Sequence, residues 1–337
     1  MKHSVKRISA KDVAAYAGVS PSTVSRVLND NAAISDKTKK AVQDACKELH
    51  YVPNISARSL SGYRSNSIAV IIPDISDPNY ASMCSAIERC AADCNFHILL
   101  IDTLYDPDFE LVAITRMLSH KVDGFLIASC SLQAQEQHAS VLKDTPCIYI
   151  GENHNSLCSY VESDNNQGAY GAAQYLYHLG HRRIAFIGGT YGTRTFDLRI
   201  NGYRRFMQDN KLSCYEIIPR QKMCNLSNWY TEEITHLLTD NQMPDAFLVY
   251  SDIEAIHIMG AARHCGIHIP NDISVVSFDD IPIGQSPLIG LTTVTMHTVQ
   301  LGRLAVQRLV EKINGSQYRT ADIVQPELMI RSSSRKK

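Results

Sequence analysis

Short apolar runs alternate with helix-like segments along most of the chain, and this alternation restricts the fold more than any other feature. The first series is SIAVII, HILLID, GFLIAS and CIYIG, and a second follows as RIAFIGG, EIIP, AFLVYSD and ISVVSFDD. Short apolar runs without polar alternation are typical of strands buried on both faces of a parallel sheet. The two series therefore predict an α/β body of two lobes, each a doubly wound parallel sheet.

The first fifty residues follow a different, helical pattern. Ser9-Ala10-Lys11-Asp12 matches a capping box, and Gly18 can end the helix that it opens. Ser20 and Pro21 suit the cap and the first position of a second helix. A third helix is expected from Ser35. Two short helices around a glycine turn, followed by a third, predict a helix-turn-helix head.

The chain has a basic N-terminal segment and an acidic remainder. Residues 1–64 hold eleven Lys or Arg against five Asp or Glu, a net of +6, whereas the remainder carries a net of −7. A solvated charged surface would give the same composition. Because the positive charge coincides with a helix-turn-helix pattern, we interpret it as a nucleic-acid surface. Arg26 lies on the polar face of the second helix and could contact guanine in a bidentate manner.

Several other classes of protein find no support in the sequence. No apolar run reaches the about 20 residues of a membrane span, and the N-terminus lacks the apolar core of a signal peptide. We therefore expect a cytoplasmic protein without membrane contact, whose ten cysteines stay reduced. Phosphate-binding, dinucleotide-binding and nucleophile-elbow motifs are absent. We expect no enzyme, and no catalytic residue, metal or cofactor.

DVAAYAGVSPSTVSRVLN followed by YVPNISARSLSG resembles the head of the lactose-repressor/galactose-repressor family of bacterial transcription regulators. The likeness continues at lower density to the C-terminus. It implies a three-helix head at residues 1–53, a hinge helix and linker at 54–65, and a periplasmic-binding-protein-like body at 66–337. It also implies that the last strands cross back between the lobes. The expected N-lobe is then about 66–163 plus 293–323, and the expected C-lobe is about 164–292 plus 324–337.

The resemblance also implies the residues that would contact double-stranded operator DNA. Pro21 and Ser22 match the variable base readers and Arg26 the more constant one. Because Pro21 and Ser22 are both small, we expect weak or water-mediated readout from them. Leu60 matches the leucine that paired hinge helices wedge into the minor groove. The predicted DNA contacts are Ser20, Pro21, Ser22, Thr23, Ser25, Arg26, Asn29, Asn54, Ala57 and Leu60.

Residues that directly follow the strands are the candidates for a small-molecule effector, because open parallel sheets bind ligands beyond their carboxyl ends. In the resembled family, the residues matching Arg199 and Asp279 grip adjacent sugar hydroxyls. Ser251 and Met296 stand where many members have asparagine and glutamine, so one side of the pocket is expected to be less polar. The predicted effector site comprises Asp77, Asn79, Tyr80, Ser129, Arg199, Ser251, Asp279 and Met296.

Together these features predict a ligand-responsive repressor of sugar-utilisation genes. It would bind a palindromic operator as a homodimer and be released by a small sugar in the interlobe cleft. The short tail RSSSRKK has no heptad repeat, so we expect no tetramer. Two alternatives stay open: the same regulator with a nucleobase or nucleoside corepressor, or a sugar-binding module without DNA control. The basic head argues against the second.

Overall fold

The computed structural model describes most of the chain. Its residues separate into two compact units, 1–65 and 66–337. The described ranges are 8–28, 34–51, 64–128, 132–143, 145–151, 158–189, 193–219, 226–239 and 243–337.

The first unit contains three short helices around a small core. The side-chain oxygen of Ser9 accepts from the N–H of Asp12, and Asp12 accepts from the N–H of Ser9, which forms the predicted capping box before α1. Gly18 ends α1 with φ of 65°. The core consists of Val13, Ala14, Val24, Val27, Val42 and Ala45. The helices are α1 (Ala10–Ala17), α2 (Pro21–Leu28) and α3 (Asp36–Glu48).

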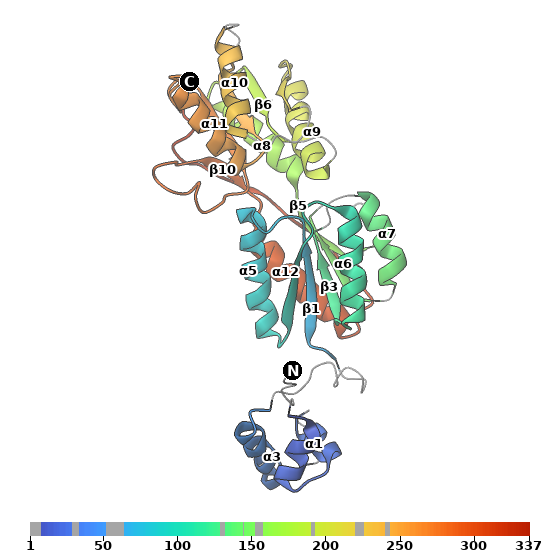
Figure 1. The fold of residues 1–337 in the computed structure, drawn as a ribbon. Helices are drawn as coiled ribbons and strands as arrows, with labels where there is room; N and C mark the ends of the chain where they lie inside the picture. The colour runs from blue at the N-terminus through green and yellow to red at the C-terminus, as the bar shows by residue number, and fades with distance from the viewer. Residues whose placement is uncertain are drawn as a thin grey trace. The chain divides into compact units, whose positions relative to one another are not determined.

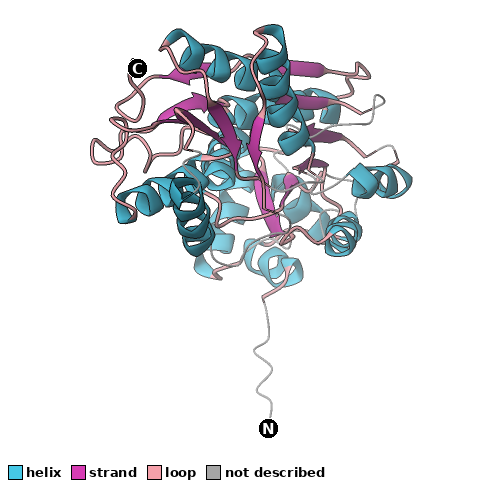
Figure 2. Ribbon diagram, turned by 90° about the horizontal axis from the view of Figure 1, so that it is seen from above, coloured by secondary structure: helices cyan, strands magenta, loops and turns pink. Residues whose placement is uncertain are grey.

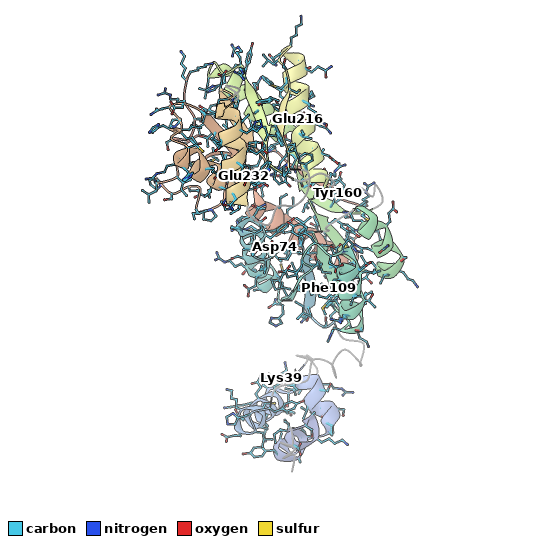
Figure 3. All side chains as sticks on the ribbon, turned by 45° about the horizontal axis from the view of Figure 1, so that its top comes forward. Lys39, Asp74, Phe109, Tyr160, Glu216 and Glu232 are labelled. Atoms are coloured by element: carbon cyan, nitrogen blue, oxygen red, sulfur yellow. The ribbon has the colours of Figure 1, made fainter. Side chains whose placement is uncertain are left out.

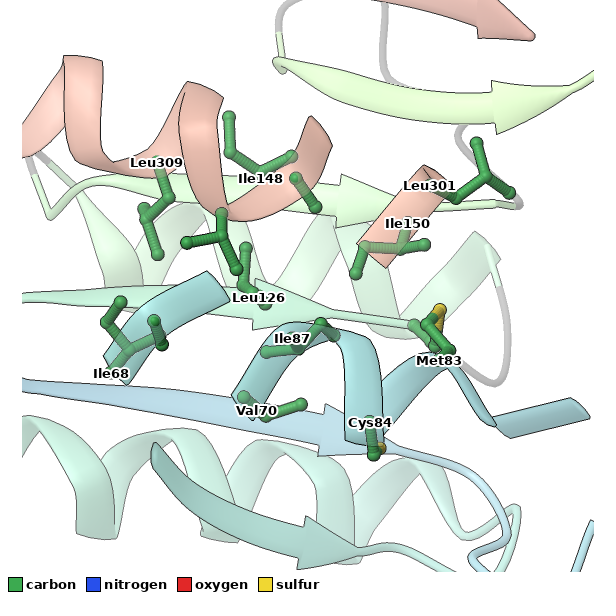
Figure 4. Packing of buried hydrophobic residues seen from close by; sticks show 14 of the residues in the cluster. Ile68, Val70, Met83, Cys84, Ile87, Leu126, Ile148, Ile150, Leu301 and Leu309 are labelled. Carbon is green, nitrogen blue, oxygen red and sulfur yellow. The ribbon is translucent and has the colours of Figure 1, made fainter. Parts of the chain in front are cut away.

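The N-lobe of the second unit is built on a six-stranded, wholly parallel sheet with the order β11-β5-β4-β3-β1-β2. Helices α5 and α12 share one hydrophobic cluster with the strands, while α6 and α7 contribute to the cluster on the other face. Figure 4 shows α5 and α12 packing their apolar side chains on the first of these faces. The strands are β1 (Ser67–Ile72), β2 (His97–Asp102), β3 (Gly124–Ile127), β4 (Cys147–Ile150), β5 (Tyr160–Ser163) and β11 (Ala321–Val324). The helices are α5 (Pro78–Asp93), α6 (Pro107–Ser119), α7 (Leu132–Leu142) and α12 (Thr298–Ile313).

The C-lobe repeats this plan with the strand order β12-β10-β9-β8-β6-β7. All its pairings are parallel except that of β10 with β12, which is antiparallel. Helices lie on both sides of the strands (Figures 1 and 2). The strands are β6 (Ile184–Ile187), β7 (Tyr215–Ile217), β8 (Ala246–Val249), β9 (Ser274–Phe278), β10 (Thr292–Thr295) and β12 (Glu327–Met329). The helices are α8 (Asn165–His178), α9 (Arg194–Asp209), α10 (Leu226–Thr239) and α11 (Asp252–His264).

The chain passes between the two sheets three times, after β5, after β10 and after β11. One predicted lobe boundary is corrected by this topology. Residues 293–295 were expected in the N-lobe, but β10 pairs in parallel with β9 of the C-lobe sheet. The chain passes from the C-lobe to the N-lobe after β10, in the short connection to α12.

The strand HILLID also differs from its expected position. It forms β2, which lies at the edge of the N-lobe sheet rather than in its buried centre. Leu99 and Leu100 are consequently 39% and 41% exposed. An edge strand has a neighbour on one side only, so its side chains keep contact with solvent despite their apolar character.

Candidate functional site

The polar face of α2 in the head is open to solvent. Pro21, Ser22, Ser25 and Arg26 are exposed, whereas Thr23 is half-buried. Ser20 accepts from the N–H of Thr23 at 3.1 Å, so its hydroxyl caps the helix. The exposed face therefore offers one cation and small hydroxyl groups.

For four of the predicted DNA contacts the structure gives no position. Asn29, Asn54, Ala57 and Leu60 lie outside the described residues. Their roles stay predictions.

Arg199, on the first turns of α9, is the buried anchor of the interlobe site. Its guanidinium donates to Asn165 Oδ1 at 2.8 Å, to the carbonyl oxygen of Tyr250 at 2.6 Å and to Asp279 Oδ1 at 2.8 Å. It also lies over the ring of Phe278, 4.5 Å from the centroid. Burial, the largest single effect, would lower the pKa of Arg199, but the charge of Asp279 and its hydrogen bond, together with the charges of Tyr250 and Asp252, raise that pKa overall. A guanidinium fixed at each of its nitrogens is a rigid platform for a ligand.

Asp279 and Asp280, directly after β9, form a strained turn. Their φ angles are 110° and 57°, in a region that non-glycine residues rarely occupy. Asp279 is held by Arg199, and Asp280 pairs with Arg331 at 2.5 Å. Such strain persists only where the surroundings hold the backbone in place. Here an arginine holds each of the two carboxylates.

Asp252, the first residue of α11, holds the same turn in place through hydrogen bonds. It is fully buried and accepts from the hydroxyls of Ser277 and Thr293 at 2.5 and 2.7 Å, and from the N–H of Ile281 at 2.9 Å. One carboxyl group thus ties α11 to β9, to β10 and to the turn. Burial, and after it the charge of Asp279, raise the pKa of Asp252 to about 7.

Glu254, which is half-buried, forms a second acidic contact close to Arg199. Its carboxylate accepts from the hydroxyl of Tyr230 and from the N–H of Gly189, the latter at 2.9 Å. A Cβ atom at Gly188 would lie 1.8 Å from Glu254 Oε2, so this approach requires glycine there. Burial raises the pKa of Glu254.

The N-lobe contributes Asp77 from the loop after β1. Asp77 caps α5 by accepting from the N–H of Asn79 at 2.8 Å. Burial, and then the charge of Asp279, raise the pKa of Asp77 to about 6. Asp74, labelled in Figure 3, precedes it in the same loop. The two lobes therefore present carboxylates to each other, Asp77 from one and Asp279 from the other.

A cleft of about 500 Å³ opens beside this group. Asp279 belongs both to the cleft wall and to the Arg199 network, so the cleft adjoins that network. Its walls come from α5, from the turn after β9 and from the β10–α12 connection. The lining residues are Asn79, Ser82, Asp279, Asp280, Ile281, Pro282, Gln285, Thr295, His297, Thr298, Val299, Gln300 and Arg303.

Three of the predicted effector residues pack in the hydrophobic clusters of the lobes or cap a helix. Tyr80 packs against the N-lobe cluster beneath α5 and α12. Ser251 caps α11 by accepting from the N–H of Glu254 at 3.3 Å. Met296 is 4% exposed and packs in the C-lobe cluster with α8 and α9. Ser129 lies outside the described residues.

Asp252, Glu254 and Asn165 are residues of the network that were not among the predicted site residues. Asp252 lies three positions after the end of β8, so its place just beyond a strand end was the signal that could have selected it. Asn165, which accepts from Arg199, follows β5. That strand reads YVES and has no apolar run, so its end was not recognised as a site position.

The described residues contain no cluster of three or more His, Cys, Asp or Glu side chains placed to hold a metal ion. None of the helices in the described ranges has the length and the apolar run that crossing a bilayer requires.

Comparison with known proteins gives consistent results for both units. The family model "Bacterial regulatory proteins, lacI family" matches residues 9–54, and "Periplasmic binding protein-like domain" matches residues 173–334. The HTH-type transcriptional regulator DegA of Bacillus subtilis (strain 168) is 34% identical over 330 residues, which cover 96% of this chain and 97% of DegA.

Two solved structures show that the similarity extends to the three-dimensional fold. The lac repressor dimer bound to operator and the anti-inducer ONPF superimposes with a TM-score of 0.88 at 25% identity, covering 98% of this chain and all of that one. The complex of the transcriptional regulator CelR with cellobiose gives a TM-score of 0.68 at 26% identity, covering 97% of this chain and all of that one.

Every matched protein named here is a transcriptional regulator and none is an enzyme, which fits a non-enzymatic role. The head, the two-lobed body and the full-length similarity agree. This chain belongs to the lacI family of bacterial regulatory proteins, as a DNA-binding transcriptional regulator with a ligand-binding body.

Proposed function

We propose that this chain is a repressor that acts in the cytoplasm as a homodimer. It binds a palindromic operator through its heads and is controlled by a small sugar or sugar derivative in the interlobe site. The observation that carries the proposal is the presence, in one chain, of an exposed helix-turn-helix face and a rigid Arg199–Asp279 pair in the C-lobe, whose Asp279 lines the cleft between the lobes.

On the DNA side, support comes from the exposure of the α2 face. The side chain of Arg26 is free of the head's core and reaches outward, as a major-groove contact requires. Its small neighbours allow the helix backbone to approach the bases closely. Hydroxyls that are not used as caps, such as that of Ser25, can bind phosphate oxygens.

Support for a homodimer comes from apolar side chains that the single chain leaves in solvent. Leu104 and Tyr105, directly after the edge strand β2, are 71% and 41% exposed. On the C-lobe, Ile283 and Leu288 are 54% and 96% exposed. Exposed apolar residues on both lobes fit a surface that is buried against a second copy, as in the dimeric lac repressor structure.

For the effector, support comes from the hydrogen-bonding geometry of the interlobe site. A guanidinium and a carboxylate held 2.8 Å apart can each bind neighbouring hydroxyls of one sugar ring. The similar CelR structure holds cellobiose. The nucleobase alternative depended on Ser251 and Met296, of which Ser251 caps α11 and Met296 packs in the C-lobe cluster.

Control would follow from linkage between the two ligands. The cleft is walled by both lobes, so an effector there favours one arrangement of the lobes over others. If that arrangement disfavours operator binding, operator must weaken effector binding by the same factor.

The proposal is tested first on DNA. The full chain is used to select binding sequences from a random DNA pool, and the affinity for the selected operator is measured by fluorescence anisotropy at fixed salt. We expect two-fold symmetric sequences, and we expect Arg26→Ala to lose about 1–3 kcal/mol of specific binding. Lys47→Ala, on α3, is the matched control for loss of one positive charge. Failure to enrich any symmetric site would contradict the proposal.

A further inference from the structure

Two basic triplets that lie far apart in the sequence meet at one end of the C-lobe. The first, HRR at residues 181–183, directly precedes β6, and the second is RKK at residues 335–337. Nε2 of His181 lies 3.1 Å from the carbonyl oxygen of Arg335. The N–H of Lys337 donates to the carbonyl oxygen of Leu179 at 2.8 Å. Residues 335–337 are therefore fixed against the segment that follows α8.

Asp245, directly before β8, joins the two triplets. Its carboxylate accepts from the N–H groups of Arg182 and Arg183, both at 3.0 Å, and pairs with Lys337 Nζ at 2.7 Å. The N–H of Arg335 donates to Ser274 Oγ, at the start of β9, at 3.1 Å. The second triplet is thus part of the folded lobe, and its backbone holds a defined position at the amino ends of the strands.

This end of the C-lobe carries an excess of positive charge. The carboxylates among the linked residues are Asp245 and its neighbour across the surface, Asp272, which accepts from the N–H of His268 at 2.7 Å. Five exposed cations stand against these two carboxylates, although residues 65–337 as a whole carry a net charge of −7. The five cations form what we call the C-lobe basic surface: Arg182, Arg183, Arg335, Lys336 and Lys337.

Two arginines of the C-lobe basic surface are positioned by uncharged groups. The guanidinium of Arg182 donates to the carbonyl oxygens of Tyr177 and His181, both at 2.9 Å, and lies 3.9 Å from the centroid of the Tyr177 ring. The guanidinium of Arg335 donates to Oδ1 and to the carbonyl oxygen of Asn271, at 2.8 and 3.0 Å. Within the described ranges, neither guanidinium has a carboxylate within ion-pair distance.

Neutral acceptors fix the direction of a guanidinium without cancelling its charge. Less side-chain freedom is then lost when an anion binds, so a positioned arginine is a better anion contact than a freely rotating one. Arg182 and Arg335 both fit this description, and Asp245 holds the backbone segments that carry them within one surface.

The C-lobe basic surface lies away from the Arg199 network. Ser274, which accepts from Arg335, begins β9, whereas Asp279 directly follows the end of the same strand. A strand of five residues separates the two positions by roughly 15 Å. A molecule bound to the C-lobe basic surface can therefore leave the effector cleft open.

We propose that the C-lobe basic surface docks an acidic segment of a partner protein, with Arg182 and Arg335 each binding a carboxylate in a bidentate manner. The planar fork of a guanidinium matches the two oxygens of a carboxylate. A short acidic segment meets this surface alone, whereas a DNA duplex lying across it would also meet the acidic remainder of the body. The proposal depends neither on the effector nor on operator binding.

The first test uses the full chain and a defined probe. A labelled short peptide of alternating glutamate and glycine is titrated in fluorescence anisotropy, and the same peptide with glutamine in place of glutamate is the control. We expect the glutamate peptide to bind and the glutamine peptide not to bind. Binding should weaken as the salt concentration rises from about 0.05 to about 0.25 M, because salt screens exposed charges. No binding of the glutamate peptide at the lower salt concentration would overturn the proposal.

The second test locates the binding. The double variant Arg182→Gln/Arg335→Gln should bind the glutamate peptide roughly tenfold more weakly. Arg116→Gln/Lys121→Gln is the matched control, because it removes two exposed positive charges from the N-lobe. An equal loss in both double variants would show a general effect of charge and overturn the proposal. Lys336→Glu keeps both arginines and their hydrogen bonds, so it must also weaken peptide binding even if the double variant is unstable.

The third test separates a protein partner from nucleic acid. Binding of a random-sequence DNA duplex and of the selected operator is measured for wild type and for Arg182→Gln/Arg335→Gln. We expect both affinities to stay unchanged, because the heads supply the DNA contacts. If the double variant loses duplex affinity as strongly as peptide affinity, the surface binds nucleic acid and the proposal is overturned. A wild-type chain that binds the peptide but selects no operator would contradict the proposed function alone.

Discussion

Replacing Asp252 with asparagine should change how the stability of the body depends on pH. Asp252 is fully buried, and its folded-state pKa of about 7 lies above its ordinary value of 3.8. A carboxyl group whose pKa is raised by folding stabilises the protein below its unfolded pKa, and this contribution is lost as the pH rises through the folded pKa.

The magnitude follows from these two pKa values. They differ by roughly three pH units, each worth about 1.4 kcal/mol, so ionised Asp252 costs about 4 kcal/mol at pH 8. At pH 5 the carboxyl group is protonated in the folded protein but ionised in the unfolded chain, and the loss of stability is about 1–2 kcal/mol. Between these pH values the wild-type protein therefore loses about 2–3 kcal/mol that Asp252→Asn does not lose.

Asparagine can keep the geometry of the site. Its carbonyl oxygen can accept from the N–H of Ile281, and its amide can donate to the hydroxyl of Ser277 or Thr293, each of which can also accept. Any residual loss in hydrogen bonding is the same at both pH values. The quantity to measure is therefore how much the difference in unfolding free energy between variant and wild type changes from pH 5 to pH 8. The size of that difference at a single pH is not decisive.

The assay is urea unfolding of wild type and Asp252→Asn at about pH 5 and pH 8. Asp245→Asn serves as the control. Hydrogen bonds from Lys337 and from the N–H groups of Arg182 and Arg183 outweigh burial and lower the pKa of Asp245, so its stabilisation is constant above about pH 4. We expect the Asp252 difference to grow in favour of the variant by about 2–3 kcal/mol from pH 5 to pH 8. A difference that is equal at the two pH values would refute the reasoning.

Three further predictions concern other parts of the body. Arg199→Met should cost about 3–5 kcal/mol in urea unfolding, because it leaves Asp279 buried without its partner, and Asp279→Asn in the same chain should recover part of the loss; a double variant no better than the single one would contradict this. Gly202→Ala should destabilise the C-lobe by about 1–3 kcal/mol, because its Cβ would lie 2.2 Å from the carbonyl oxygen of Asn166, and an unchanged midpoint would show that the two helices separate freely. Leu288→Asp should raise the dimer dissociation constant in sedimentation without lowering thermal stability, since Leu288 is 96% exposed; an unchanged constant would exclude this residue from the interface.

The sequence predicts strands well where both faces are buried and less well elsewhere. The β1, β3, β6 and β8 strands are almost wholly apolar, β9 reads SVVSF with two buried serines, and all five lie inside their sheets. The β5 and β11 strands read YVES and ADIV, in which buried or half-buried residues alternate with more exposed ones, and the pattern did not reveal them. The β2 strand was predicted correctly as a strand but wrongly as buried, because an edge position depends on strand order, which local composition does not encode.

Prediction from the sequence is limited in a similar way for the hydrogen-bond network around Arg199. The resemblance to a known family points to Arg199 and Asp279, and the structure joins them at 2.8 Å. The position of Asp252 after a strand marks it as a candidate, but its hydrogen-bond partners were not predictable, because they lie 25 to 41 positions away in sequence. Such contacts arise only after β9, β10 and α11 have assembled.

The three passages of the chain between the sheets also determine when each part can fold during synthesis. The N-lobe cluster beneath α5 includes Leu301, Ala305 and Leu309 of α12, and its sheet ends in β11. The C-lobe sheet is complete only with β12, which follows β11 in the sequence. Neither lobe can therefore complete its sheet until the segment with β11 and β12 has been synthesised. The head has its own core within the first fifty residues, so the DNA-reading unit can form long before the unit that regulates it.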